Sequence, residues 1–207
     1  MKLVEKLGIK STGVYLINSP FGVGKTTITC VLSGELYLMG KNVLYLTEDT
    51  GIKQIQRKLV KIIDVTNEYR DGGVLIKKHT DLKKAIDSAL EKQNFDVIIA
   101  DGSISDIDYE YCKQISQDKN AIMIITNTVN TNITGESRIG YEFKGIQSSD
   151  MIINIARKKE VTLLESMKYG WFFWLKRPNR TIKIIKNRFG KESSFDVNID
   201  FEKIKVK

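Results

Sequence analysis

The residue types best suited to chemistry lie together in one short loop, residues 19–27. The loop reads Ser-Pro-Phe-Gly-Val-Gly-Lys-Thr-Thr, which fits the G-x-x-x-x-G-K-[ST] pattern of phosphate-binding loops except that Ser19 replaces the first glycine. In such a loop the backbone N–H groups surround phosphates, the glycines permit close approach, the lysine adds charge and the threonine hydroxyl can ligate Mg²⁺. We therefore predict that this phosphate loop binds a nucleotide. Its candidate binding residues are Ser19, Pro20, Phe21, Gly22, Val23, Gly24, Lys25, Thr26 and Thr27.

Acidic residues follow two apolar segments further along the chain. Asp101 ends the apolar run 95–101, and a carboxylate at the end of a parallel strand can hold Mg²⁺ together with Thr26. Glu48 follows another apolar run and can orient and deprotonate an attacking water. We favour Glu48 over Asp49 for this role, because Asp49 or Thr50 is expected to cap the next helix.

A third strand end carries an amide. Asn127 follows the apolar segment 121–126, where its side chain could contact a terminal phosphate or the attacking water. The alternative is a local turn made by an asparagine at a strand end.

These residues need a scaffold that brings strand ends together. Apolar runs alternate with segments of helical periodicity up to residue 126, which predicts a mostly parallel sheet covered by helices on both faces. Beyond residue 150 apolar and polar residues alternate, as in half-exposed antiparallel strands. We therefore expect one α/β domain over residues 1–207, with antiparallel C-terminal strands. The expected strands are 14–18, 43–46, 74–76, 97–100, 121–126, 151–156, 181–185 and 195–199, and the expected helices are 26–39, 51–64 and 81–92.

The charge is distributed unevenly. The chain of 207 residues has 33 basic and 25 acidic side chains, a net charge of +8. Residues 1–150 hold 19 of each, whereas residues 151–207 hold 14 basic and 6 acidic residues. Such a region suits an anionic partner, either nucleic acid or the phosphates of a neighbouring subunit, although a solvated basic face explains it equally well. No apolar stretch is long enough to span a membrane, and two cysteines, Cys30 and Cys112, favour reduced thiols in the cytoplasm.

In their order the motifs resemble the RecA-like ATPase superfamily, most closely its DnaB-type helicase and RadA-type branches. The resemblance extends from Tyr15 to about Ile199. Its segments are the phosphate loop, residues 45–48 leading to Gln54 and Arg57, residues 97–101 with Ser103, residues 124–127, residues 135–150 entering the strand 151–157, and residues 184–190. Within the last segment, residues 186–190 read Lys-Asn-Arg-Phe-Gly, a signature of the RadA-type branch.

The resemblance implies a RecA-like fold and a Mg²⁺-dependent ATPase with ATP and Mg²⁺ as cofactors. Glu48 becomes the catalytic base, Asn127 stands where the family has a Gln or His sensor, and Arg57 joins the nucleotide site. Lys186 and Arg188 would reach the γ-phosphate of a neighbouring subunit in a head-to-tail hexamer or filament. Two cations at positions i and i+2 of one strand share a face, although they can also be an ordinary solvated pair.

Two segments bear on the partner. The loop 128–138 occupies the position of a DNA-contacting loop, but its only basic residue is Arg138. Residues 158–180 form an insertion that is atypical of the family, in which aromatic residues lie among cations; we favour a hairpin that completes the core over a base-stacking or partner-binding surface. The expected function is action on single-stranded DNA in replication, recombination or repair, and the alternative is a nucleotide-switched regulatory or scaffolding protein of the KaiC type without DNA activity.

Overall fold

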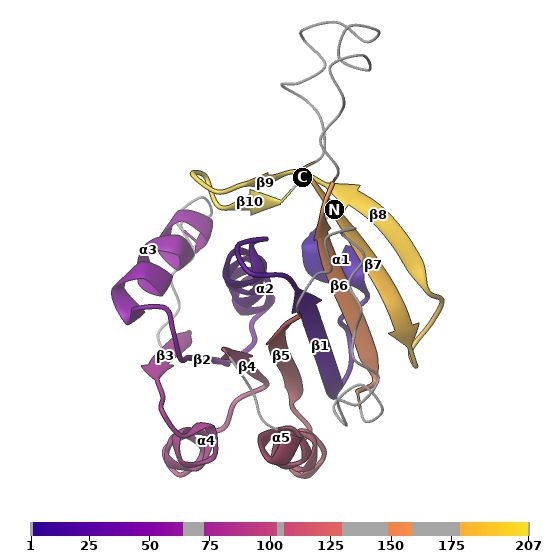
Figure 1. Ribbon diagram of the computed structural model, residues 1–207. Coiled ribbons are helices and arrows are strands. Elements are labelled where there is room, and N and C mark those ends of the chain that lie inside the picture. The colour runs from indigo at the N-terminus through magenta and orange to yellow at the C-terminus, as the bar shows by residue number, and fades with distance from the viewer. Residues whose placement is uncertain (1, 64–72, 103–105, 130–148, 159–178, 207) are drawn as a thin grey trace, which may run out of the picture.

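The chain folds around one large β-sheet with helices on both faces (Figure 1). The computed structural model describes residues 2–63, 73–102, 106–129, 149–158 and 179–206. The helices are α1 (Leu3–Leu7), α2 (Lys25–Leu38), α3 (Ile52–Ile63), α4 (Leu82–Leu90) and α5 (Asp106–Asp118). The strands are β1 (Gly13–Ser19), β2 (Val43–Thr47), β3 (Val74–Lys78), β4 (Val97–Asp101), β5 (Ile122–Thr128), β6 (Met151–Arg157), β7 (Arg180–Asn187), β8 (Ser193–Val197), β9 (Ile199–Asp200) and β10 (Lys205–Val206).

The sheet has eight strands in the order β3-β2-β4-β5-β1-β6-β7-β8. All neighbours from β3 to β6 pair in parallel, and β7 runs antiparallel to both β6 and β8. The mostly parallel sheet with antiparallel C-terminal pairing is thus confirmed. One detail differs: β6 was expected to be a half-exposed antiparallel strand. It does pair antiparallel with β7, but it also pairs in parallel with β1, and most of its residues are buried.

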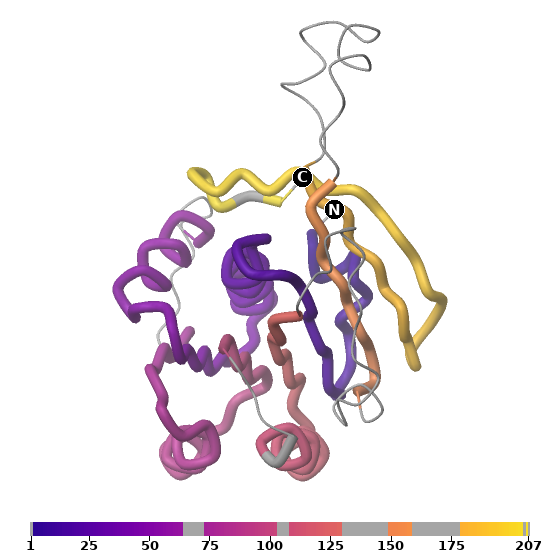
Figure 2. The backbone as a smooth tube through the Cα atoms, viewed as in Figure 1, coloured from indigo at the N-terminus to yellow at the C-terminus, as the bar shows by residue number. Residues whose placement is uncertain are grey.

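Side chains of the central strands alternate between two separate apolar cores. Tyr15, Tyr45 and Ile99 belong to the core beneath α1, α2 and α3, whereas Leu16 and Leu44 belong to the core beneath α4 and α5. Successive residues of a strand point to opposite faces, so a sheet buried on both faces requires unbroken apolar runs. Figure 2 shows α2 and α3 on one side of the central strands and α4 and α5 on the other.

The helices follow their apolar periodicity. In α3 the buried residues Ile55, Leu59 and Ile63 recur every four positions and pack toward α2. In α4 the N-cap is Asp81, whose carboxylate accepts from the backbone N–H of Lys84 at 3.0 Å. The sequence analysis missed α1, which has five residues, and α5, in which polar residues outnumber apolar ones.

The C-terminal hairpin of β9 and β10 lies over α2 (Figure 1), and Phe201 and Ile199 lie against Gly24 of the phosphate loop. Lys61 of α3 anchors the turn of this hairpin by donating to the carbonyl of Glu202 at 2.8 Å. The hairpin therefore covers the side of the molecule on which the phosphate loop lies. In the described part of the chain, no helix is both long and apolar enough to cross a membrane.

Candidate functional site

The phosphate loop connects the carboxyl end of β1 to the first turn of α2, as predicted. Ser19 ends β1 and is buried, while Gly22 and Gly24 have φ values of 71° and 115°. This left-handed region costs glycine little and other residues considerably more. Because α2 begins at Lys25, its unpaired N-terminal N–H groups lie at the loop, where they favour an anion.

The Lys25 ammonium lies on the loop itself. It donates to the backbone oxygen of Ser19 at 3.1 Å, to the Ser19 hydroxyl at 3.3 Å and to the Pro20 carbonyl at 3.4 Å. Burial lowers the pKa of Lys25, and the charge of Asp101 opposes this shift. An ammonium that is partly desolvated and held by carbonyls is well placed to exchange those contacts for phosphate oxygens.

Asp101 lies at the centre of a buried hydrogen-bond network. Its carboxylate accepts from the Tyr45 hydroxyl at 2.9 Å, from the Thr126 hydroxyl at 3.2 Å and from Thr26 of the phosphate loop. Burial raises the pKa of Asp101, and these three hydrogen bonds oppose the shift. The Tyr45 hydroxyl also shares a hydrogen bond of 2.7 Å with Thr29, so the orientation of the carboxylate is fixed from both sides.

The Thr26 hydroxyl and the Asp101 carboxylate form a donor set that fits Mg²⁺. Magnesium prefers oxygen ligands, and in proteins it is commonly held by one or two side chains together with water and substrate phosphates. The described residues contain no group of three or more His, Cys, Asp or Glu side chains that could hold a metal. A cation here would therefore be bound together with a phosphate ligand.

A pocket of about 410 Å³ opens in front of this network. Its described lining consists of Phe21, Gly22, Gly24, Lys25, Thr26, Thr27, Asp49, Thr50, Lys58, Asp101, Gly102, Thr126, Thr128 and Phe201. Most of the phosphate loop and Asp101 thus meet in one cavity, as the motifs predicted. The sequence analysis did not single out Thr126, Lys58 or Phe201.

The two acids that follow β2 occupy different positions. The backbone N–H of Glu48 donates to the Asp101 carbonyl at 3.1 Å, and its side chain lies against Gly102, where an added Cβ would come within 2.7 Å of a Glu48 carboxylate oxygen. Glu48 therefore lies next to Gly102, which lines the pocket, but Glu48 is not itself among the described lining residues. Asp49 is exposed and lines the pocket.

The expectation that Asp49 or Thr50 caps the following helix is wrong. Helix α3 begins at Ile52, and the Gly51 carbonyl accepts from the N–H groups of Gln54 and Ile55. Gly51 therefore holds the cap position. The carboxylate of Asp49 remains available at the pocket.

Two other candidate residues do not line the pocket. Asn127 lies in β5 between Thr126 and Thr128, both of which do, so strand alternation turns its side chain to the opposite face. Arg57 is exposed on α3. It lies two positions after the buried Ile55, about 200° further around the helix, which turns it away from the core and the pocket.

Two arginines donate hydrogen bonds to the backbone of the phosphate loop, and the sequence analysis did not predict this role for either of them. They face each other across the pairing of β6 and β7. Arg157 donates to the Gly22 carbonyl at 3.2 Å, and the buried Arg180 donates to the Val23 carbonyl at 2.7 Å. The Arg180 guanidinium also lies 5.4 Å from the centre of the Phe201 ring. These contacts fix the loop backbone and the aromatic ring beside it.

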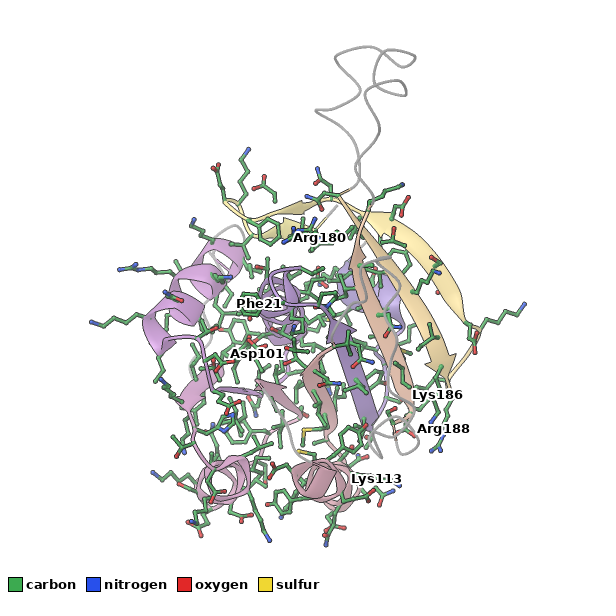
Figure 3. All side chains as sticks on the ribbon, in the orientation of Figure 1. Phe21, Asp101, Lys113, Arg180, Lys186 and Arg188 are labelled. Carbon is green, nitrogen blue, oxygen red and sulfur yellow. The ribbon has the colours of Figure 1, made fainter. Side chains whose placement is uncertain are left out.

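Lys186 and Arg188 lie at the other edge of the sheet (Figure 3). Arg188 pairs with Asp150 at 3.0 Å, and the second oxygen of Asp150 accepts from the N–H of Val14 at the start of β1. β1 has seven residues, a length of about 20 Å, which separates Arg188 from the phosphate loop of the same chain.

These cations and a third form a basic cluster, defined here as Lys113 of α5, Lys186 and Arg188. Burial lowers the pKa of Lys186, and the charges of Arg188 and Lys113 add to this effect. The expectation that Lys186 and Arg188 lie in one strand is wrong: Lys186 belongs to β7, but the strand ends at Asn187, one residue before Arg188. The two side chains are nevertheless electrostatic neighbours.

Two predictions fall on residues outside the described ranges. Nearly all of the loop 128–138, expected to contact DNA, and nearly all of the insertion 158–180 lie there. They remain predictions.

Cys30 and Cys112 are free and both are buried. Comparison with known proteins adds nothing to the structural argument: no model of a protein family matches the sequence, and no curated protein does either.

Proposed function

We propose that this protein is a Mg²⁺-dependent ATPase of the RecA-like type. The observation that carries the proposal is the meeting, in one pocket, of Lys25, the N-terminus of α2 and the hydrogen-bonded pair of Thr26 and Asp101. Cationic and N–H donor groups suit the phosphates, and adjacent oxygen ligands suit the metal that accompanies them. Phe21 and Phe201 at the pocket provide aromatic surface for a nucleobase.

The residues divide the chemistry among themselves. Loop amides and Lys25 bind the β- and γ-phosphates, Thr26 and Asp101 hold Mg²⁺, and Tyr45 orients Asp101. When bound, Mg²⁺ neutralises phosphate oxygens and so stabilises the charge of the transition state. A water attacks the γ-phosphorus and gives its proton to Glu48, while the bond from that phosphorus to the bridging oxygen breaks and ADP leaves.

The basic cluster acts on a second copy of the chain. Because about 20 Å of strand separates Arg188 from its own phosphate loop, Lys186 and Arg188 serve the neighbour's γ-phosphate. A site built from opposite edges of two subunits demands a head-to-tail interface, which generates a ring or a filament. Arg188 is half-exposed and held by one acid, so a phosphate can compete for it.

The order of the motifs and the sheet support the RecA-like assignment. The phosphate loop follows β1, Glu48 follows β2, Asp101 ends β4, and the antiparallel β7 carries the Lys-Asn-Arg-Phe-Gly segment into the turn before β8. The basic excess of residues 151–207 favours single-stranded DNA as the partner. A regulatory role without DNA is the alternative.

ATP hydrolysis measured across protein concentration, with and without a single-stranded oligonucleotide, tests the proposal. Lys25→Ala provides the background rate. We expect the rate per chain to rise with concentration, because the site needs two copies, and to rise further with DNA in a manner that falls steeply with salt. A rate of hydrolysis that does not change when DNA is added supports the regulatory alternative. A wild-type rate equal to that of Lys25→Ala refutes the proposal that the protein is an ATPase.

A further inference from the structure

Lys58 presents a second ammonium to the pocket, in addition to that of Lys25. It lies on α3, one residue after Arg57, and its Nζ donates to the Thr27 hydroxyl at 3.2 Å. Thr27 is buried in the first turn of α2, at the end of the helix where its free N–H groups attract an anion. Lys58 therefore connects α3 to the phosphate-binding end of α2.

Among the described residues, Lys58 forms no ion pair. The described ion pairs join Lys41 to Asp96, Lys84 to Asp81, Lys158 to Asp196 and Arg188 to Asp150. Within the described residues no carboxylate pairs with Lys58, and its ammonium donates to the neutral Thr27 hydroxyl. Lys58 is also half-buried and lines the pocket. Asp49 and Asp101 line the same cavity but do not pair with Lys58. A half-buried ammonium that faces a cavity and forms no ion pair with the described carboxylates is suited to an anionic ligand.

The position of Lys58 on the helix explains why it, and not Arg57, lines the pocket. Ile55 and Leu59 form the buried stripe of α3, and Lys58 lies three positions after Ile55 and next to Leu59, on the edge of that stripe. Arg57 lies on the opposite side. An alignment of sequence motifs alone cannot distinguish these adjacent residues.

We propose that Lys58 is a second phosphate-binding cation of the same chain, which contacts the nucleotide's phosphate chain at Thr27. This inference rests on the proposed nucleotide site and identifies a further residue of it. The ammonium donates three hydrogen bonds, so it can retain Thr27 and bind phosphate oxygens at the same time. α3 follows directly after Glu48 and Asp49, and the contact therefore ties the segment with the candidate base to the bound nucleotide.

Binding measurements on Lys58→Met and Lys58→Gln test the assignment. Calorimetric titrations use ATP and inorganic tripolyphosphate, each with Mg²⁺. We expect both variants to bind both ligands about tenfold more weakly than wild type, because a hydrogen bond to a charged group is lost. Lys58→Arg should recover most of the affinity. Gln can retain the contact with Thr27 without the charge, which separates a phosphate contact from a merely structural one.

Lys53→Met is the matched control, since Lys53 lies on the exposed side of the same helix and does not line the pocket. It should bind as wild type does. Unchanged affinity in Lys58→Gln, or a loss that affects ATP but not tripolyphosphate, overturns the phosphate assignment. If wild type binds neither ligand, or if Lys25→Ala binds as wild type does, the proposed nucleotide site itself fails.

Discussion

The two edges of the parallel sheet hold complementary groups that are too far apart to meet within one chain. At the carboxyl edge Lys25, Thr26 and Asp101 surround a pocket. At the amino edge Lys186 and Arg188 lie beside Asp150. Each edge is fixed by its own hydrogen bonds, and about 20 Å of β1 lies between them.

The comparison shows how the two edges differ in design. The acid at the carboxyl edge is buried and bonded to three hydroxyl groups, so its position is strongly constrained. The acid at the amino edge pairs with a half-exposed arginine, an interaction that contributes little to stability and can be exchanged. This difference is compatible with the proposed site shared between two copies, in which the adaptable edge would exchange its acid for a phosphate.

Arg188→Ala should have the largest effect of the predictions that follow. We expect the ATPase rate to fall about a thousandfold, because a cation that stabilises the transition state is lost, while ATP binding remains. Mixing it in equal amounts with Lys25→Ala should restore activity at about a quarter of the interfaces, where an intact phosphate loop meets an intact arginine. The measurement is steady-state hydrolysis at constant total chain concentration.

Lys191→Ala is the control for this experiment, because Lys191 is exposed in the same turn between β7 and β8. It should hydrolyse ATP as wild type does. If the mixture is no more active than its two components, the two edges do not act together and the shared site is refuted.

A pair of variants next identifies the base at the carboxyl edge. Glu48→Gln should lower the rate of hydrolysis about a hundredfold with ATP affinity unchanged, because general base catalysis is lost. Asp49→Asn should have a small effect, although Asp49 lines the pocket. The comparison requires single-turnover rates at saturating ATP. The opposite result assigns the base to Asp49, whose carboxylate the structure leaves at the pocket.

The sequence predicted much of the carboxyl edge because its residues follow strand ends directly. Residues 19–27 were found from local spacing, and Asp101 from the apolar run before it. The strands before them are buried on both faces, so their sequences are continuous apolar runs that are easily recognised. The polarity of the sheet then places both at one edge without further information.

The residues that were missed depend on contacts between distant segments. Arg157 and Arg180 donate hydrogen bonds to backbone carbonyls of the phosphate loop. Because every residue has a backbone carbonyl, such contacts cannot be predicted from residue types. The sequence analysis assigned Arg57 and not its neighbour Lys58 to the nucleotide site, because the motif does not show which side of α3 faces the pocket. The cap of α3 was misjudged because Gly51 fills it with backbone alone.

The smallest expected effect is the loss of one buried tyrosine hydroxyl, and each edge of the sheet has a tyrosine in which it can be measured. Tyr45 donates to Asp101, and Tyr15 donates to the Ser11 carbonyl at 2.8 Å near the amino edge; both rings are fully buried. Tyr15→Phe should lower the free energy of unfolding by about 1 kcal/mol, the value of one hydrogen bond. Tyr45→Phe should lower it by about 2 kcal/mol, because the Tyr45 hydroxyl is bonded to both Asp101 and Thr29. Only Tyr45→Phe should raise, by a few-fold, the Mg²⁺ concentration needed for half-maximal hydrolysis.

The same pair predicts a pH effect. The hydrogen bond from Tyr45 lowers the pKa of Asp101 against the effect of burial, so its removal lets that pKa rise. As the pH falls, Tyr45→Phe should therefore lose activity at a higher pH than wild type, whereas Tyr15→Phe should follow the wild-type profile. Rate profiles at fixed Mg²⁺ measure this shift. Identical profiles for the two variants would mean that the tyrosine contributes stability alone and that ionisation of Asp101 does not limit the reaction.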